Sequence, residues 1–233
     1  MKLRLALFSL ALSLLFAPLT AQSSPAFEEI ERLDKSAVVL REITGAPDSR
    51  IPQNLLDHAN CVAVVPTLVK GGFIFGGRDG KGVISCRSKI SNTWGAPSFF
   101  TVGGGSFGLQ IGGKATDLVM LIMNERGVEK LPVSKFTLGG DASAAAGPVG
   151  REAAAMTDAQ MNAHILTYSR SRGLFAGVSL DGSVIKSDSN AIRRFYNKDT
   201  TPRKILVLND AIVPAGASQF TDTLQSLSPV EKK

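Results

Sequence analysis

The stretch that decides the fold is residues 94–124, WGAPSFFTVGGGSFGLQIGGKATDLVMLIMN. It contains two spacings that are typical of enzymes. Gly103, Gly105 and Gly108 form the GxGxxG pattern of dinucleotide-binding loops. Ser106 stands at the centre of a GxSxG pattern, which is typical of hydrolase nucleophiles. Both patterns require a helix to begin directly after the glycines, because a phosphate needs free N–H groups and the nucleophile needs a strand-to-helix turn.

No helix is predicted at that point. Residues 109–113 alternate in a strand-like way and contain Gly112 and Gly113, each of which would weaken a first helical turn by about 1 kcal/mol. The segment therefore predicts a continuing strand that bends at its glycines, and neither enzyme pattern has the structural context that it needs.

Strands are also predicted on the N-terminal side of this stretch. They cover residues 61–65, 72–77 and 82–87, and the Asp79-Gly80 pair between the last two predicts a hairpin turn. Neighbouring antiparallel strands argue against a doubly wound sheet, which needs parallel βαβ units.

Two helices are predicted before these strands. Between residues 26 and 43 the apolar side chains recur every three or four positions, which indicates an amphipathic helix packed on the core by its apolar face. The apolar positions are Phe27, Ile30, Leu33, Ala37, Leu40 and Ile43. Gly45, Ala46 and Pro47 follow and end the helix, and a second, short helix is predicted over residues 51–59.

The rest of the chain continues the alternation of strands, turns and helices. We expect a buried strand over 117–124, a short helix over 125–131, a small-residue block over 136–151, a strand over 165–175, a hairpin at Asp181-Gly182 and a basic segment over 191–205. No repeat or linker is evident. The prediction is one α+β domain over residues 22–214, with a mostly antiparallel, strongly bent, barrel- or sandwich-like sheet and N-terminal helices packed on it, followed by a flexible tail over 215–233.

The first residues predict an export signal. Lys2 and Arg4 precede an apolar run over residues 5–16, and a cleavage site follows Ala21. The predicted location is the periplasm or the exterior of the cell, with peripheral contact to a membrane. Removing residues 1–21 lowers the net charge from +6 to +4, a mild excess that favours anionic surfaces.

The chain has two cysteines and two histidines, which limits the disulfides and metal sites that it can form. Cys61 and Cys86 form a disulfide if their strands lie side by side, and otherwise they are buried thiols; both alternatives stay open. No CxxC motif is present, and His58 and His164 are far apart in sequence, so neither a metal nor a cofactor is expected.

Five blocks in order give the chain a family resemblance. They are residues 51–56, 69–81, 94–124, 136–151 and 168–181. Together they resemble the SYLF domain over about residues 26–207. The resemblance implies binding rather than catalysis, because eukaryotic SYLF domains associate with phosphoinositide membranes and some bind actin filaments. For an exported chain it implies affinity for anionic phospholipid or an anionic membrane surface, and makes actin an unexpected partner.

Basic side chains are the candidates for meeting lipid phosphates. Arg170 and Arg172 are two apart in a predicted strand, so they share a face, and Tyr168 lies on the same face. The strongest charge cluster consists of Arg193, Arg194, Lys198, Arg203 and Lys204. Five more cations extend a positive surface only if the fold brings them together: Lys70, Arg78, Lys81, Lys114 and Lys135. The alternative for each group is a solvated surface.

Two other functions are weighed against lipid binding. One is an envelope structural or interaction protein without a lipid ligand. The other is a serine hydrolase with Ser106 as nucleophile, His164 as base and Asp141 as orienting acid. Nucleic acid is not expected as a partner, because the basic residues are not concentrated among stacking aromatics. The sequence leaves the lipid and the oligomeric state open.

Overall fold

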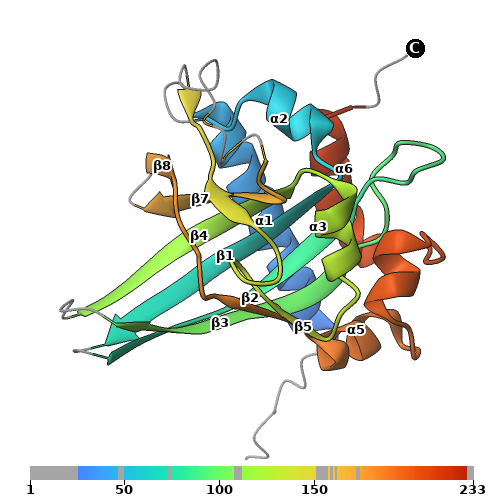
Figure 1. Ribbon diagram of the computed structural model, residues 1–233. Coiled ribbons are helices and arrows are strands. Elements are labelled where there is room, and N and C mark those ends of the chain that lie inside the picture. Colours follow the sequence, from blue (N-terminus) through green and yellow to red (C-terminus); the bar gives the residue numbers. More distant parts are fainter. Residues whose placement is uncertain are drawn as a thin grey trace, which may run out of the picture.

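Nine strands form one sheet in the computed structural model, which describes residues 26–46, 50–72, 75–107, 112–150, 157, 160, 162–171 and 174–229. The strands are β1 (Cys61–Gly72), β2 (Phe75–Cys86), β3 (Ser98–Phe107), β4 (Gly112–Ile122), β5 (Lys135–Thr137), β6 (Ala144–Ala146), β7 (Ile165–Ser171), β8 (Leu174–Gly177) and β9 (Val184–Ser187). Their order is β5-β9-β3-β2-β1-β4-β7-β6, and β8 pairs with β7 (Figure 1). The strand pairs are antiparallel except for β6 and β7, which run parallel. The predicted α+β class with a mostly antiparallel, bent sheet is confirmed.

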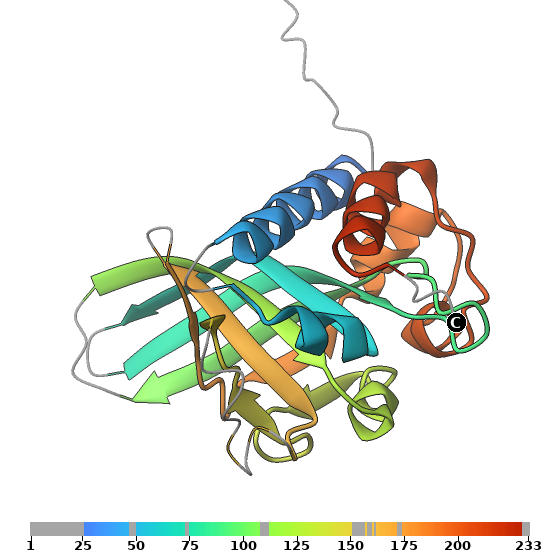
Figure 2. The ribbon, with the colours of Figure 1, turned by 90° about the horizontal axis from the view of Figure 1, so that it is seen from above.

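Helices lie on both sides of the curled sheet. They are α1 (Phe27–Gly45), α2 (Gln53–His58), α3 (Glu125–Lys130), α5 (Ser189–Tyr196), the π-helical turn η2 (Arg203–Val207), the 3-10 turn η3 (Ala215–Ala217) and α6 (Ser218–Leu227). Seen from above, α1 lies along one face of the sheet with α6 beside it, whereas α3 lies on the opposite side (Figure 2). Within the described residues, no helix is long and apolar enough to cross a membrane.

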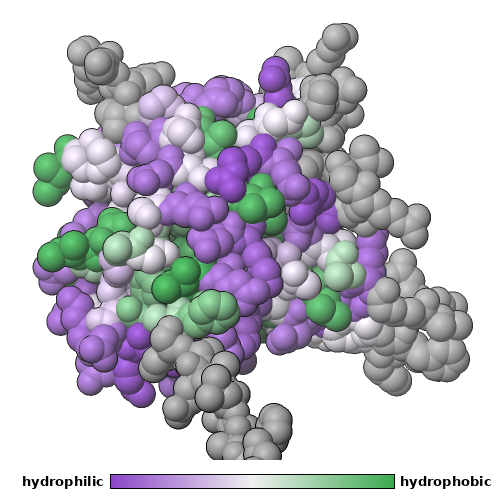
Figure 3. Space-filling model, turned by 180° about the vertical axis from the view of Figure 1, so that it is seen from behind, coloured by the Kyte–Doolittle hydropathy of each residue, from purple (hydrophilic) through white to green (hydrophobic). Residues whose placement is uncertain are grey.

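The first predicted helix is confirmed by α1, which ends at Gly45. Its stripe of Leu33, Ala37, Leu40 and Ile43 is fully buried, and the helix contacts β1, β2 and α6. Apolar residues at helical spacing gather on one side of the cylinder, so one face can be desolvated as a unit. The face of the molecule that carries α1 is mainly hydrophilic, with apolar residues grouped on one side (Figure 3).

The predicted turn at Asp79-Gly80 is wrong. Both residues lie inside β2, and the connection from β1 to β2 falls at residues 73–74, outside the described residues. A glycine is needed at position 80 because the space beside its backbone is filled. A Cβ on Gly80 would stand 2.7 Å from Cγ1 of Val65, next to the place where the register of β1 and β2 shifts.

The glycine-rich stretch forms two strands instead of one bent strand. Its first part lies in β3 up to Phe107, and its second part begins β4 at Gly112. Residues 108–111 lie outside the described residues. The two strands flank the β1–β2 hairpin, because β3 pairs with β2 and β4 pairs with β1. No helix occurs in the described part of this stretch, as predicted.

Two expectations for the C-terminal half are also corrected. The segment predicted as one strand over 165–175 contains β7 and β8, which pair with each other. Gly182 does lie in a turn, with φ +75°, but β9 pairs with β3 and β5 and not with β8, so the Asp181-Gly182 turn closes no hairpin.

The segment from residue 215 to 229 is ordered, in contrast to the predicted flexible tail. It forms η3 and α6, and Phe220 and Leu224 are fully buried where α6 packs on α1. Phe220, Leu224 and Leu227 are spaced i, i+4, i+7, which is enough to give a mostly polar segment one apolar face. Residues 230–233 lie outside the described residues.

Candidate binding surface

Tyr168 lies in the interior and not on a ligand-facing surface. Its side chain has no exposed area, and burial raises the pKa of its hydroxyl above the usual range. A Cβ on Gly147 would come within 2.1 Å of the Tyr168 ring. The small-residue block around Gly147 therefore makes room for this tyrosine, and the predicted contact of Tyr168 with a lipid at the surface is wrong.

Arg170 shares a face with Tyr168, as predicted, but its charge is held by carboxylates. Its Nε donates to Oδ2 of Asp117 at 2.6 Å, and its Nη1 pairs with Glu42 of α1. The side chain is 22% exposed. Arg170 thus ties β7 to β4 and α1, which leaves less of its charge for a phosphate. Arg172 lies outside the described residues.

The basic segment that follows β9 divides into paired and unpaired residues. Arg194 donates from Nη2 to Oε1 of Glu29 at 2.6 Å, and Glu29 has no exposed area. Arg193 forms an exposed pair with Asp199, with Nε and Oδ1 3.1 Å apart. Arg194 therefore joins α5 to the buried N-terminal part of α1, a structural role that its sequence context did not reveal.

Lys198, Arg203 and Lys204 are exposed. No ion pair of these three is present among the described residues. Arg203 lines a cleft with a volume of about 900 Å³ between the 87–92 loop, α3 and η2. Both signs of charge line this cleft, because Glu125 and Glu129 lie in it and Lys89 pairs with Glu125 at 2.7 Å. The cleft is therefore not selective for anions.

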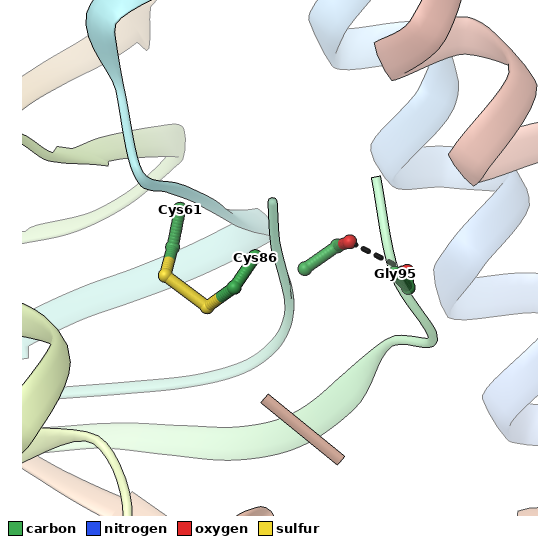
Figure 4. Close-up of a disulfide and its surroundings, with 4 residues drawn as sticks. Cys61, Cys86 and Gly95 are labelled. Carbon is green, nitrogen blue, oxygen red and sulfur yellow. Dashed lines mark hydrogen bonds between the residues drawn. A yellow bond between two sulfur atoms is a disulfide. The ribbon is translucent and has the colours of Figure 1, made fainter. Parts of the chain in front are cut away.

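The two cysteines are joined in a disulfide (Figure 4). Cys61 and Cys86 face each other directly in the β1–β2 register, which is the arrangement that bonding requires. Their side chains are 0% and 3% exposed. Next to them, the N–H of Gly95 donates to the carbonyl of Cys86 at 2.9 Å, which fastens the following loop to the same strand end.

The hydrolase triad is not assembled. Ser106 lies near the outer end of β3, in the register row of Gly76, Gly72 and Gly112. His164 directly precedes Ile165, which pairs with Ile122 at the other end of β4. Ten residues of strand separate these two rows, a distance of about 33 Å at a rise of about 3.3 Å per residue.

Asp141 and His164 bond locally instead of with Ser106. Oδ2 of Asp141 accepts from the N–H of Thr137 at 2.7 Å, and Nδ1 of His164 accepts from the N–H of Ser143 at 3.3 Å. Across the described part of the chain, no three His, Cys, Asp or Glu side chains gather as a metal site would require. A non-catalytic role fits this arrangement.

Three of the cations that the fold had to bring together do meet. Lys70 of β1 is the register partner of Arg78 in β2 and of Lys114 in β4. Residues paired across neighbouring strands point to the same face, so the three side chains form a row across the sheet. We call Lys114, Lys70 and Arg78 the cationic row. Burial, together with Arg78 and Lys114, lowers the pKa of Lys70.

The other two cations of that set lie elsewhere. Lys81 is an odd number of residues from Arg78 in β2, so it points to the opposite face of the sheet. Lys135 lies in β5 opposite Lys186 of β9. No sequence signal separates these two from the cationic row, because only the strand register decides which lysines are neighbours.

The ends of the four central strands project beyond the helices, as Figures 1 and 2 both show. The cationic row lies two residues before the last pairs of the β1–β2 and β1–β4 ladders, Gly72 with Gly76 and Gly72 with Gly112. The row on its inner side is buried and consists of Leu68, Gly80, Val102 and Thr116. The row on its outer side pairs Gly72 with Gly76 and with Gly112, so three of its positions have no side chain.

The apolar space inside the curled sheet is too small for a ligand. A cavity of about 30 Å³ lies there, lined by residues that include Ile84, Met120, Phe136 and Leu206. Small-molecule sites are typically about 300–1,000 Å³ in volume. Within the part of the chain that the structure describes, the interior of the sheet therefore offers no ligand site, and the cleft of about 900 Å³ beside η2 is the larger space.

Known proteins share this domain. Residues 103–227 match the family model described as Ysc84, Las17-binding protein actin regulator. Protein YSC84 of Saccharomyces cerevisiae is 39% identical over 190 residues, which are 78% of this chain and 40% of that protein. LAS seventeen-binding protein 3 of Saccharomyces cerevisiae is 41% identical over 174 residues, 73% of this chain and 37% of that protein. The human SH3 domain-containing YSC84-like protein 1 is 34% identical over 200 residues, 83% of this chain and 58% of that protein.

These relatives correct the expected partner. From the sequence, an anionic phospholipid or membrane surface was the expected partner, and actin was unexpected. The family description and the names of the relatives refer instead to Las17, to SH3 domains and to actin regulation, which points to protein partners. The chain spans between 37% and 58% of the lengths of these three relatives. Since the family model covers more than half of the chain, and the SYLF resemblance is borne out by it, this protein belongs to the Ysc84 family.

Proposed function

We propose that this chain is a non-catalytic binding module whose partner is a protein of the actin-regulating class. The observation that carries the proposal is the extent of the shared region. The relatives align over 73% to 83% of this chain, and their names describe Las17 binding or membership of the YSC84 group. Because the shared region is the domain described above, we assign binding of this kind to the domain.

The shape of the domain supports a macromolecular partner. The ends of β1 to β4 project beyond the helices, and the interior cavity of about 30 Å³ is smaller than a small-molecule site. The separation of Ser106 from His164 supports a role without catalysis.

Co-sedimentation with actin filaments tests the proposal, together with retention by immobilised Las17. We expect the chain to pellet with filaments or to be retained by Las17, and we expect high salt to weaken the interaction. Neutral and anionic vesicles are run in parallel as a comparison. Binding to anionic vesicles with no binding to either protein would overturn the proposal.

Export is a separate proposal with its own test. It rests on the basic and apolar pattern of residues 1–21, which lie outside the described residues. The full-length chain should be recovered from the envelope or the medium of a bacterial host with a mass that corresponds to a start at Gln22. A full-length mass in the cytosolic fraction would remove the export proposal and leave the binding proposal intact.

A further inference from the structure

We infer that the cationic row, made of Lys114, Lys70 and Arg78 on β4, β1 and β2, binds an acidic segment of a protein partner. The inference rests on the proposed function and names the surface and the partner chemistry that would serve it. It starts from an arrangement that costs folding energy, since like charges directly opposite each other on neighbouring strands repel.

No carboxylate within the described ranges relieves this repulsion. The ion pairs that those residues form involve other arginines and lysines. Lys114 is exposed, and Lys70 and Arg78 are partly exposed. The charges are thus unneutralised and open to an outside partner, which would supply the missing carboxylates.

Arg78 is held in position for this role. Its Nη1 donates to Oγ of Ser183 at 2.7 Å, and Ser183 is buried in the segment between β8 and β9. One contact leaves the guanidinium with further donors, and an anchored side chain loses less conformational entropy when it binds. Lys70 and Lys114 make no hydrogen bond or ion pair with the described residues, so their ammonium groups can adjust to the ligand.

The form of the surface favours an extended acidic segment over a single phosphate. Phosphate sites usually surround the anion with free backbone N–H groups, as at a helix N-terminus or a nest. Here the strands use their N–H groups in the ladder with their neighbours, and only side chains are offered. Adjacent strands are about 4.8 Å apart, so the row spans about 10 Å. Alternate carboxylates of an extended peptide are about 7 Å apart, a spacing that long lysine and arginine side chains can meet.

Glycine rows leave room for such a segment to approach. Outside the cationic row, Gly72, Gly76 and Gly112 present only backbone on the same face. On the opposite face of the projection, a Cβ at Gly71, Gly103 or Gly105 would meet no atom within 4 Å, so packing within the described residues does not require these glycines. Within the described residues, these glycines leave only backbone beside the cationic row on that side.

The test uses the full chain and a fluorescent peptide of alternating Glu and Gly, with a Gln-Gly peptide as the neutral control. Binding is measured by anisotropy at low salt and at 1 M salt, where the screening length is about 3 Å. We expect the acidic peptide alone to bind, and to be released at high salt. The variant K70Q/R78Q/K114Q should bind the acidic peptide at least about tenfold more weakly. The three lost contacts are exposed ion pairs, each of which contributes up to about 1 kcal/mol.

A charge-matched control separates this surface from the other basic cluster. K198Q/R203Q/K204Q also removes three positive charges, all from exposed positions outside the cationic row. It should change the affinity for the peptide by less than about threefold. The charge-preserving variant K70R/K114R should bind like the unmodified chain. Equal losses in the two neutral triple variants would mean that net charge alone acts, and would overturn the assignment to the cationic row.

Thermal unfolding guards against a folding defect. The melting temperature of K70Q/R78Q/K114Q should stay within a few degrees of that of the unmodified chain, because the removal of like-charge repulsion offsets the loss of the Arg78–Ser183 hydrogen bond. If the unmodified chain binds actin filaments or Las17 and the triple variant binds them equally, this inference fails while the proposed function stands. If neither the proteins nor the acidic peptide bind, both fail. Two outcomes would assign the row to phosphate and refute an acidic protein segment. One is displacement of the peptide by inorganic phosphate at the same concentration of negative charge. The other is binding to anionic vesicles alone that is lost in K70Q/R78Q/K114Q.

Discussion

Arg194→Ala should destabilise the domain far more than Arg193→Ala, although the two arginines are adjacent on the same helix. Arg194 neutralises Glu29, whose side chain has no exposed area, and its own side chain is 40% exposed. Arg193 pairs with Asp199, and those side chains are 65% and 92% exposed. The pair provides a control that is matched in residue type, helix and charge.

The magnitude follows from what each truncation leaves behind. Removing one partner of a buried ion pair costs about 3–5 kcal/mol, because the remaining charge is desolvated and uncompensated. Arg194 is partly exposed, and Arg32 is also within electrostatic reach of Glu29, so the lower end applies. We expect a loss of about 3 kcal/mol for Arg194→Ala and of about 1 kcal/mol or less for Arg193→Ala.

Urea unfolding followed by tryptophan fluorescence measures both variants. Trp94 is the only tryptophan, it is 5% exposed, and its Nε1 donates to the carbonyl of Ser228 at 3.2 Å. Its emission should therefore change when the α6 end of the domain unfolds. In a melting experiment, about 3 kcal/mol corresponds to a fall of roughly 6–12 °C for a domain of this size.

Equal destabilisation by Arg194→Ala and Arg193→Ala would refute the reasoning. A second variant tests the cause. Adding Glu29→Gln to Arg194→Ala removes the stranded charge, so the double variant should be more stable than Arg194→Ala alone. If the double variant is less stable by the sum of both single losses, burial of an unpaired carboxylate is not the reason for the effect.

Three further predictions concern stability. Replacing Cys61 and Cys86 together by alanine should lower the free energy of unfolding by about 3.5 kcal/mol, from the closure of a loop with a sequence separation of 25, and an unchanged urea midpoint would contradict this. Gly147→Ala should lower the free energy of unfolding by about 3 kcal/mol or more, because its Cβ would meet the Tyr168 ring at 2.1 Å. Gly71→Ala, where a Cβ meets no atom within 4 Å, should change it by about 0.5 kcal/mol or less. Similar melting temperatures for the two variants would contradict the crowding at Gly147. Phe220→Ala should cost about 3–5 kcal/mol, measured by urea unfolding, and a negligible effect would show that α6 is dispensable.

Local patterns in the sequence predicted the elements that depend on local rules. The 3.6-residue spacing of Leu33, Ala37 and Leu40 predicted α1, because one apolar face suffices for docking. The glycines at 112 and 113 ruled out a helix after Ser106, since they add conformational freedom to the unfolded chain.

Local sequence patterns did not predict how the strands pair around the cationic row. An Asp-Gly pair commonly forms a hairpin turn, but here Gly80 lies within β2, where the nearby Val65 side chain leaves no room for a Cβ. That one misplaced turn hid the pairing of Lys70 with Arg78, and with it the cationic row. Register is set by contacts between residues that are distant in sequence, and a shift of one residue moves every side chain to the other face.

The sequence by itself determined the fold class, the family resemblance, the N-terminal helix and the candidate cations. Only the tertiary structure decided which cations act together. It buried Tyr168, committed Arg170 and Arg194 to carboxylates, and set Lys70 beside Arg78 and Lys114. The physical reason is that charge type and periodicity belong to single residues and their near neighbours, whereas the neutralisation of a charge depends on which groups packing brings within a few ångströms of it.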